Sequence, residues 1–151
     1  SFTMKATFNR GIGAYSGKMD GVVFCYYHRE GVVLVRKYTY PKLTENNHRL
    51  GSVTTNLHAL KPADGYKNDM RTYLGRYNAL KQNEGRYIRS WVNLYLKLMR
   101  AMAKQDSTID LINLTREDIF TKDLPCISVK KAVEAGLLPK VYDWQHLDRE
   151  M

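Results

Sequence analysis

The sequence predicts an α+β fold, in which a small antiparallel sheet, made of an N-terminal strand and a β-hairpin, packs against about five helices. Three observations lead to this prediction. Residues 1–9 alternate between apolar and polar side chains, as a half-buried strand does. Residues 21–41 contain two runs rich in Val, Tyr and Leu around a short turn, as a hairpin does. From residue 44 onward, apolar residues recur at three- and four-residue steps, which indicates amphipathic helices.

The N-terminal strand has one apolar face, formed by Phe2, Met4, Ala6 and Phe8. A strand at the end of a chain can add to the sheet of a neighbouring copy, which satisfies backbone groups that would otherwise stay open. We therefore expect Phe2, Met4 and Phe8 to be assembly contacts between copies of the chain.

The connection over residues 10–18 is rich in glycine but does not match a phosphate-binding loop. Such a loop has glycine where Ile12 stands and Ser or Thr where Met19 stands, and a helix follows it. Here a strand pattern follows instead. We expect a flexible turn that leads into the hairpin, and no nucleotide site.

The predicted hairpin turns at residues 28–31, where Gly31 supplies a backbone conformation that side chains oppose. Both faces of its arms are apolar near this turn, so the hairpin should be covered on both sides. The second arm ends in a basic and aromatic stretch before Pro41 stops the strand. Because cations contact phosphates and aromatic rings stack on bases, we expect this stretch to bind nucleic acid. Its candidate residues are Arg36, Lys37, Tyr38, Tyr40 and Lys42.

The five helices are expected at residues 45–60, 64–82, 86–104, 116–120 and 129–135. Thr44, Thr115 and Ser128 have side chains suited to cap the first, fourth and fifth of them. Pro62 ends the first helix, and residues 83–85 break the second.

The third helix combines a wide apolar face with a narrow face on which every charged residue is basic. So wide an apolar face indicates a central helix buried on several sides. We expect the basic stripe to be a second nucleic-acid surface, the alternative being a solvated face that keeps the protein soluble. Its residues are Arg86, Arg89, Lys97, Arg100 and Lys104. The eleven tyrosines also have an alternative role, filling an ordinary core with their hydroxyl groups at its edge.

The chain has 151 residues and a net charge of +9 that is unevenly distributed. Residues 1–104 have 18 Lys and Arg against 6 Asp and Glu, whereas residues 105–151 have 6 against 9. This distribution suits binding to a polyanion such as DNA or RNA, and it equally suits contact between copies of the chain. We expect a single domain with a β-rich part (1–42), a basic helical part (44–104) and an acidic cap of short helices (105–151).

Nothing in the sequence indicates catalysis, a metal or a cofactor. The four histidines form no ligand cluster, and Cys25 and Cys126 have neither zinc nor redox spacing. No apolar run approaches the ~18 residues of a membrane span, and the first residues lack the apolar core of a signal peptide. We expect a protein without membrane insertion, cytoplasmic by default, with an extracellular or virion-associated assembly left open.

Four segments of the first third of the chain show a resemblance: SGKMDGVVF at 16–24, YY at 26–27, GVVLVR at 31–36 and YPKLT at 40–44. They resemble uncharacterised small basic bacterial proteins that open with a GKxxGxVxY hairpin, a glycine turn, a basic strand end and a Pro-Lys segment. Residues 123–130 and 135–140 are similar to the same group. The resemblance implies no activity, cofactor or site residue.

These patterns together predict a non-enzymatic structural or assembly protein that forms a homo-oligomer or polymer and binds a polyanion, with nucleic acid as the leading candidate. One alternative is a purely structural subunit of a filament, shell or phage-like particle without nucleic acid. The other is a DNA-binding regulator of the helix-turn-helix kind, because two short helices flank residues 123–127. Plain packing of an acidic C-terminal cap is the favoured explanation of those two helices, because the second helix is short and little else there is basic.

Overall fold

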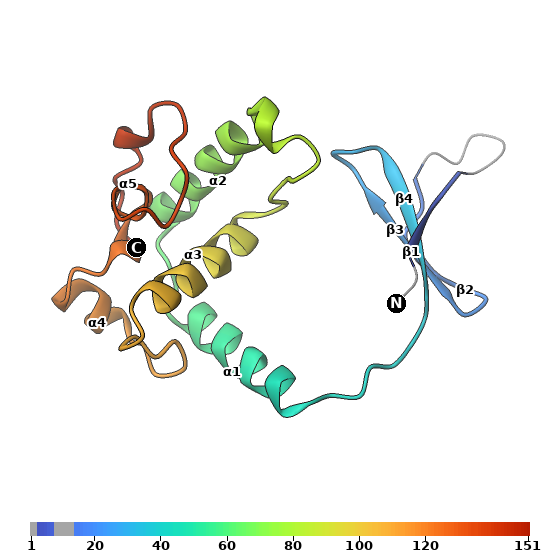
Figure 1. The fold of residues 1–151 in the computed structure, drawn as a ribbon, viewed down its shortest axis with the longest axis horizontal. Coiled ribbons are helices and arrows are strands. Elements are labelled where there is room, and N and C mark those ends of the chain that lie inside the picture. Colours follow the sequence, from blue (N-terminus) through green and yellow to red (C-terminus); the bar gives the residue numbers. More distant parts are fainter. Residues whose placement is uncertain (1–2, 8–13) are drawn as a thin grey trace. The chain divides into compact units, whose positions relative to one another are not determined.

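The computed structural model describes residues 3–7 and 14–151 (Figure 1). These residues form a four-stranded antiparallel sheet and five α-helices, so the predicted α+β class is confirmed. The strands are β1 (Thr3–Ala6), β2 (Gly17–Met19), β3 (Val22–Tyr27) and β4 (Val32–Lys37). The α-helices are α1 (Glu45–Ala59), α2 (Asp64–Ala79), α3 (Trp91–Gln105), α4 (Arg116–Thr121) and α5 (Val129–Glu134). Three short 3₁₀ helices are η1 (Lys81–Asn83), η2 (Pro125–Ile127) and η3 (Trp144–His146).

The chain divides into two compact units, which we call unit 1 (Ser1–Leu43) and unit 2 (Thr44–Met151). The division coincides with the predicted change from the β-rich part to the helical part. The acidic C-terminal residues belong to unit 2 together with the basic helices. That the two units form a single domain stays a prediction.

Unit 1 contains the sheet, whose strands lie in the order β1-β4-β3-β2. β3 and β4 form the predicted hairpin, and Gly31 in its turn has a φ of +63°. β2 lies in the glycine-rich connection, for which we expected only a turn. It joins β3 through Asp20 and Gly21, which both have positive φ, as a type I′ turn requires. All six residues of β3 are half-buried, so the cover expected on both faces of the hairpin is partial.

β1 is a strand, as predicted, and it pairs with β4 at one edge of the described sheet. Its apolar side chain Met4 is 47% exposed, because an edge strand has a strand neighbour on one side only. Phe2 and Phe8 lie outside the described residues. The assembly role of Phe2, Met4 and Phe8 therefore stays a prediction.

The core of unit 2 is built on α2 and α3, which pack against each other. α5 packs on α2 and η2 packs on α3, so the acidic C-terminal part shares this core. The largest fully buried side chains of α2 and α3 are Tyr66, Met70, Tyr73, Leu94, Tyr95, Leu98, Met99 and Met102. α3 therefore packs against both α2 and η2, as expected for a central helix, and five of its 15 residues are buried.

Three of the buried tyrosines place their hydroxyl groups on backbone carbonyl oxygens. Tyr66, Tyr73 and Tyr95 donate hydrogen bonds of 2.7–2.8 Å to Cys126, Pro139 and Leu57 respectively. Burial raises the pKa of all three. For these residues the core role of tyrosine is confirmed.

The third helix begins later than predicted, at Trp91 instead of residue 86. The side-chain amide of Asn78, on α2, accepts from the Ile88 N–H (3.0 Å) and donates to the Ile88 carbonyl (2.9 Å). These two bonds hold the segment before α3 in a non-helical conformation. Ser90 then caps α3 by accepting from the Asn93 N–H. Arg86 and Arg89 therefore precede the helix and are not on its basic face.

The last residues of unit 2 are fastened to its core. The buried carboxylate of Asp69 accepts from the Arg149 backbone N–H (3.0 Å), Nε (2.9 Å) and Nη2 (2.6 Å). The Met151 side chain is buried, its N–H donates to Ile127, and its carbonyl accepts from Arg116. The contacts from Arg149 satisfy the buried charge of Asp69, which would otherwise be costly.

Candidate nucleic-acid interface

One face of the sheet brings cations from separate strands together. Lys18 of β2 is opposite Val23 of β3, which is opposite Arg36 of β4, so these three form one cross-strand row. Paired residues of antiparallel strands share a face, and neighbouring strands are about 4.8 Å apart, which puts Lys18 and Arg36 about 10 Å apart along the row. Lys5 of β1 is opposite Leu34, two residues before Arg36, and so lies on the same face.

This row borders a hollow of about 440 Å³ at the end of the hairpin. The hollow is lined by Lys18, Val23, Arg36, Lys37, Tyr38, Thr39 and Pro41. Of these described lining residues, three are cations and none is acidic. Neighbouring cations without a carboxylate among them create a positive potential, which favours an anion.

Two tyrosines extend the hollow toward solvent. The Tyr38 N–H donates to the Gly21 carbonyl (2.7 Å), which continues the pairing past the end of β4. Lys18 Nζ lies 4.1 Å from the centre of the Tyr38 ring. The Tyr40 ring meets the Tyr38 ring edge to face, with 4.9 Å between their centres, and Tyr40 is 84% exposed. Tyr38 is therefore part of the wall, whereas Tyr40 offers its ring to solvent.

A hydrogen bond joins the hydroxyl groups of Tyr38 and Tyr40. Tyr40 donates to the Tyr38 oxygen, and Lys18 also bonds to it, so the pKa of Tyr38 is lowered. The same bond raises the pKa of Tyr40. Stabilisation of negative charge on Tyr38 is the direction expected beside a cation.

Arg36, Lys37 and Tyr38 line the hollow, and Tyr40 lies beside Tyr38. Their role in binding nucleic acid stays a prediction. Lys42 is exposed but is not one of the residues that line the hollow. Lys18 is the member that the sequence analysis missed. Its signal was the Asp20-Gly21 pair, a strong hairpin sequence that places Lys18 opposite Val23.

The predicted basic stripe lies only partly on α3. Lys97, Arg100 and Lys104 are exposed on α3, whereas Arg86 and Arg89 precede it. Arg100 and Lys104 border a groove of about 340 Å³ between α1 and α3. The floor of this groove is apolar, which suits an apolar side chain better than a phosphate. Among the predicted surfaces, the hollow of unit 1 is therefore the stronger candidate for nucleic acid.

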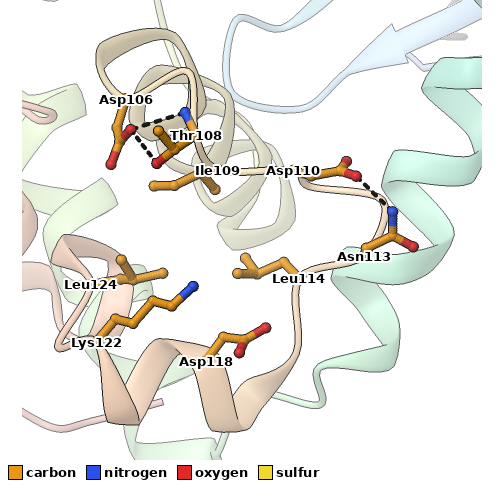
Figure 2. Close-up of a pocket in the computed structure, with 9 residues that line it drawn as sticks. All are labelled: Asp106, Thr108, Ile109, Asp110, Asn113, Leu114, Asp118, Lys122 and Leu124. Atoms are coloured by element: carbon orange, nitrogen blue, oxygen red, sulfur yellow. Dashed lines mark hydrogen bonds between the residues drawn. The ribbon is translucent and has the colours of Figure 1, made fainter.

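Unit 2 also has an acidic pocket of about 230 Å³ (Figure 2). Hydrogen bonds, chiefly from the side chains of Thr108, Asn113 and Thr115, lower the pKa of Asp106, Asp110 and Asp118 respectively. Figure 2 shows Asp106 and Asp110 apart from each other, each hydrogen-bonded to a neighbour in the loop that follows α3. Across residues 3–7 and 14–151, no three His, Cys, Asp or Glu side chains are placed to hold a metal. Hydrogen bonds within turns and a helix cap therefore account for the lowered pKa values of these carboxylates.

The two short helices of the helix-turn-helix alternative are present as α4 and α5. α5 has six residues, and Val129, Ala132 and Val133 among them are buried. Lys130 and Lys131 are half-buried, Lys131 forms an ion pair with Asp123, and the exposed residue of α5 is the acidic Glu134. A recognition helix needs basic and polar side chains facing outward, so α5 adds little to this alternative, which stays a prediction.

No protein-family model matches the chain, and no curated protein or solved structure shows significant similarity to it. In the part of the chain that the structure describes, no helix is long and apolar enough to cross a membrane. Evidence for the function of this chain therefore comes from the arrangement of its own side chains.

Proposed function

We propose that this chain is a non-enzymatic protein that binds single-stranded nucleic acid through the hollow of unit 1 and associates with copies of itself. One observation supports the binding above all others. Lys18, Arg36 and Lys37 line a hollow whose described lining has no carboxylate, next to the exposed ring of Tyr40.

The cations are suited to contact phosphates. A nucleic-acid backbone presents closely spaced negative charges, and Lys and Arg bind them while releasing condensed counterions. Arg36 offers a planar group that binds a phosphate through two N–H donors, and the lysines act as point charges. Because every nucleotide has a phosphate, these contacts select nucleic acid without selecting a sequence.

Tyr40 favours a single strand over a duplex. The bases of a duplex are already stacked on one another, whereas an unpaired base is free to stack on an aromatic ring. Tyr40 is exposed, and Tyr38 supports one side of its ring. We expect the affinity for single-stranded DNA or RNA to exceed the affinity for a duplex of the same length.

Charge reversal in the hollow tests this function. In Lys18→Glu/Arg36→Glu, two attractive contacts become repulsive, so we expect the affinity for a labelled single-stranded oligonucleotide at 50 mM salt to fall by at least about tenfold. Fluorescence anisotropy measures this affinity, and circular dichroism checks that the variant is folded.

The matched control is Lys81→Glu/Lys140→Glu, which makes the same change of net charge at two exposed lysines of unit 2. We expect it to bind nearly as tightly as the wild type. An equal loss in both double variants would mean that binding depends on net charge alone, and the hollow would be rejected as the site.

Self-association without oligonucleotide binding would favour the first alternative instead, a purely structural subunit of a filament, shell or phage-like particle. In that case the basic hollow would be a contact between subunits. Anisotropy and light scattering on the same preparation separate the two functions.

A further inference from the structure

The groove between α1 and α3 leaves the apolar side chain of Leu50 partly uncovered. Leu50 and the half-buried Ala103 line its floor together with the buried Val53 and Leu111. Leu50 belongs to the same helical series as the buried Val53 and Leu57, yet it is 41% exposed. The reason is that the first turns of α1 extend beyond the other helices of unit 2 (Figure 1).

Three cations border this apolar floor: Arg49, Arg100 and Lys104. A partly exposed apolar floor indicates an interaction surface, and a cationic border selects a partner with negative charges. The combination fits an apolar side chain that has carboxylates on either side. A phosphodiester backbone fits poorly, because it would leave the floor uncovered.

The loop that follows α3 has this complementary chemistry. Ile112 is 40% exposed, and the exposed Asp106 and Asp110 lie close to it in the chain. Hydrogen bonds to Thr108 and Asn113 hold the two carboxylates and lower their pKa, so both are ionised at neutral pH. Leu111, the neighbour of Ile112, itself lines the groove. Groove and loop therefore form one continuous surface.

We propose that this surface joins two copies of the chain across a two-fold axis. Ile112 of each copy covers the apolar floor of the other, and Asp106 and Asp110 meet its cationic border. A two-fold interface requires a surface that complements itself, and a groove beside the segment that fills it meets this requirement. This inference rests on the self-association in the proposed function and is independent of nucleic-acid binding.

Changes of apolar residues test the interface without altering the hollow. Size-exclusion chromatography with light scattering, on protein freed of nucleic acid, should show a dimer for the wild type and monomers for Leu50→Asp and Ile112→Asp. Tyr142→Asp is the control, since it places the same charge at an exposed aromatic residue of unit 2 outside the surface, and it should stay dimeric. Each monomeric variant should bind one short oligonucleotide per chain as tightly as the wild type.

Charge exchange tests the pairing itself. Arg100→Glu alone and Asp110→Arg alone place like charges in both halves of a two-fold contact, so each should raise the dimer dissociation constant by at least about tenfold. An equimolar mixture of these two variants should dimerise again, because each contact of the mixed dimer then joins opposite charges. A wild type that is monomeric at every concentration, dimers that persist in Leu50→Asp and Ile112→Asp, or a mixture that fails to dimerise would overturn the proposal.

Discussion

Lys18 and Arg36 face the same hollow because of the strand register. A shift of β2 by one residue would turn Lys18 to the opposite face of the sheet. The two-residue turn at Asp20 and Gly21 prevents such a shift, since it pairs Met19 with Val22 and therefore Lys18 with Val23. A backbone turn thus determines the charge of the site.

At the same scale, the exposed ring of Tyr40 gives a prediction about stacking. Tyr40→Ala should weaken binding to a single-stranded oligonucleotide by about 5- to 150-fold, because stacking on an aromatic side chain contributes about 1–3 kcal/mol per base. Tyr40→Phe keeps the ring and should bind like the wild type, and the affinity for a duplex should change little in either variant. Anisotropy titrations measure all of these affinities. An equal loss in the Ala and Phe variants would show that the hydroxyl group matters and that stacking does not.

Among the elements, those with local signals were predictable from the sequence. Thr44, Thr115 and Ser128 cap α1, α4 and α5 as expected. The start of α3 was not predictable, because the residue that delays it, Asn78, lies on another helix. β2 has three residues, too few to show a period, so its turn was the better signal.

The candidate site shows the same division between local and long-range information. Arg36, Lys37, Tyr38 and Tyr40 are near neighbours in the sequence, so their composition was enough to find them. Lys18 joins them only through strand pairing. Conversely, Arg86 and Arg89 fit a helical period with α3, but they are not on α3, because Asn78 holds the segment before it in a non-helical conformation.

The role of Asn78 leads to a prediction about stability. Asn78→Ala removes the partners of both the N–H and the carbonyl of Ile88, so the free energy of unfolding should fall by about 1–3 kcal/mol in urea denaturation. Asn68→Ala, at an exposed position of the same helix, should cost less than about 1 kcal/mol. If the two variants are equally stable, Asn78 does not hold the segment before α3.

At the scale of the whole molecule, the two units differ in charge and in proposed role. Residues 1–43 have 7 Lys and Arg against 2 Asp and Glu, whereas residues 44–151 have 17 against 13. The smaller unit therefore has the more one-sided positive charge, as a phosphate-binding surface requires. Self-association through unit 2 would give each dimer two hollows, which favours long strands over short ones by raising the effective concentration of the second contact.

The most direct test of nucleic-acid binding is the salt dependence of the wild-type affinity for a short single-stranded oligonucleotide. Anisotropy titrations between about 50 and 300 mM salt give the slope of log K against log salt. Three phosphate contacts, from Lys18, Arg36 and Lys37, predict a slope of about −2 for a single strand. A slope near this value, with weaker binding to the duplex, is the expected result. A slope near zero, or no binding at 50 mM salt, would contradict the assignment of the hollow to nucleic acid.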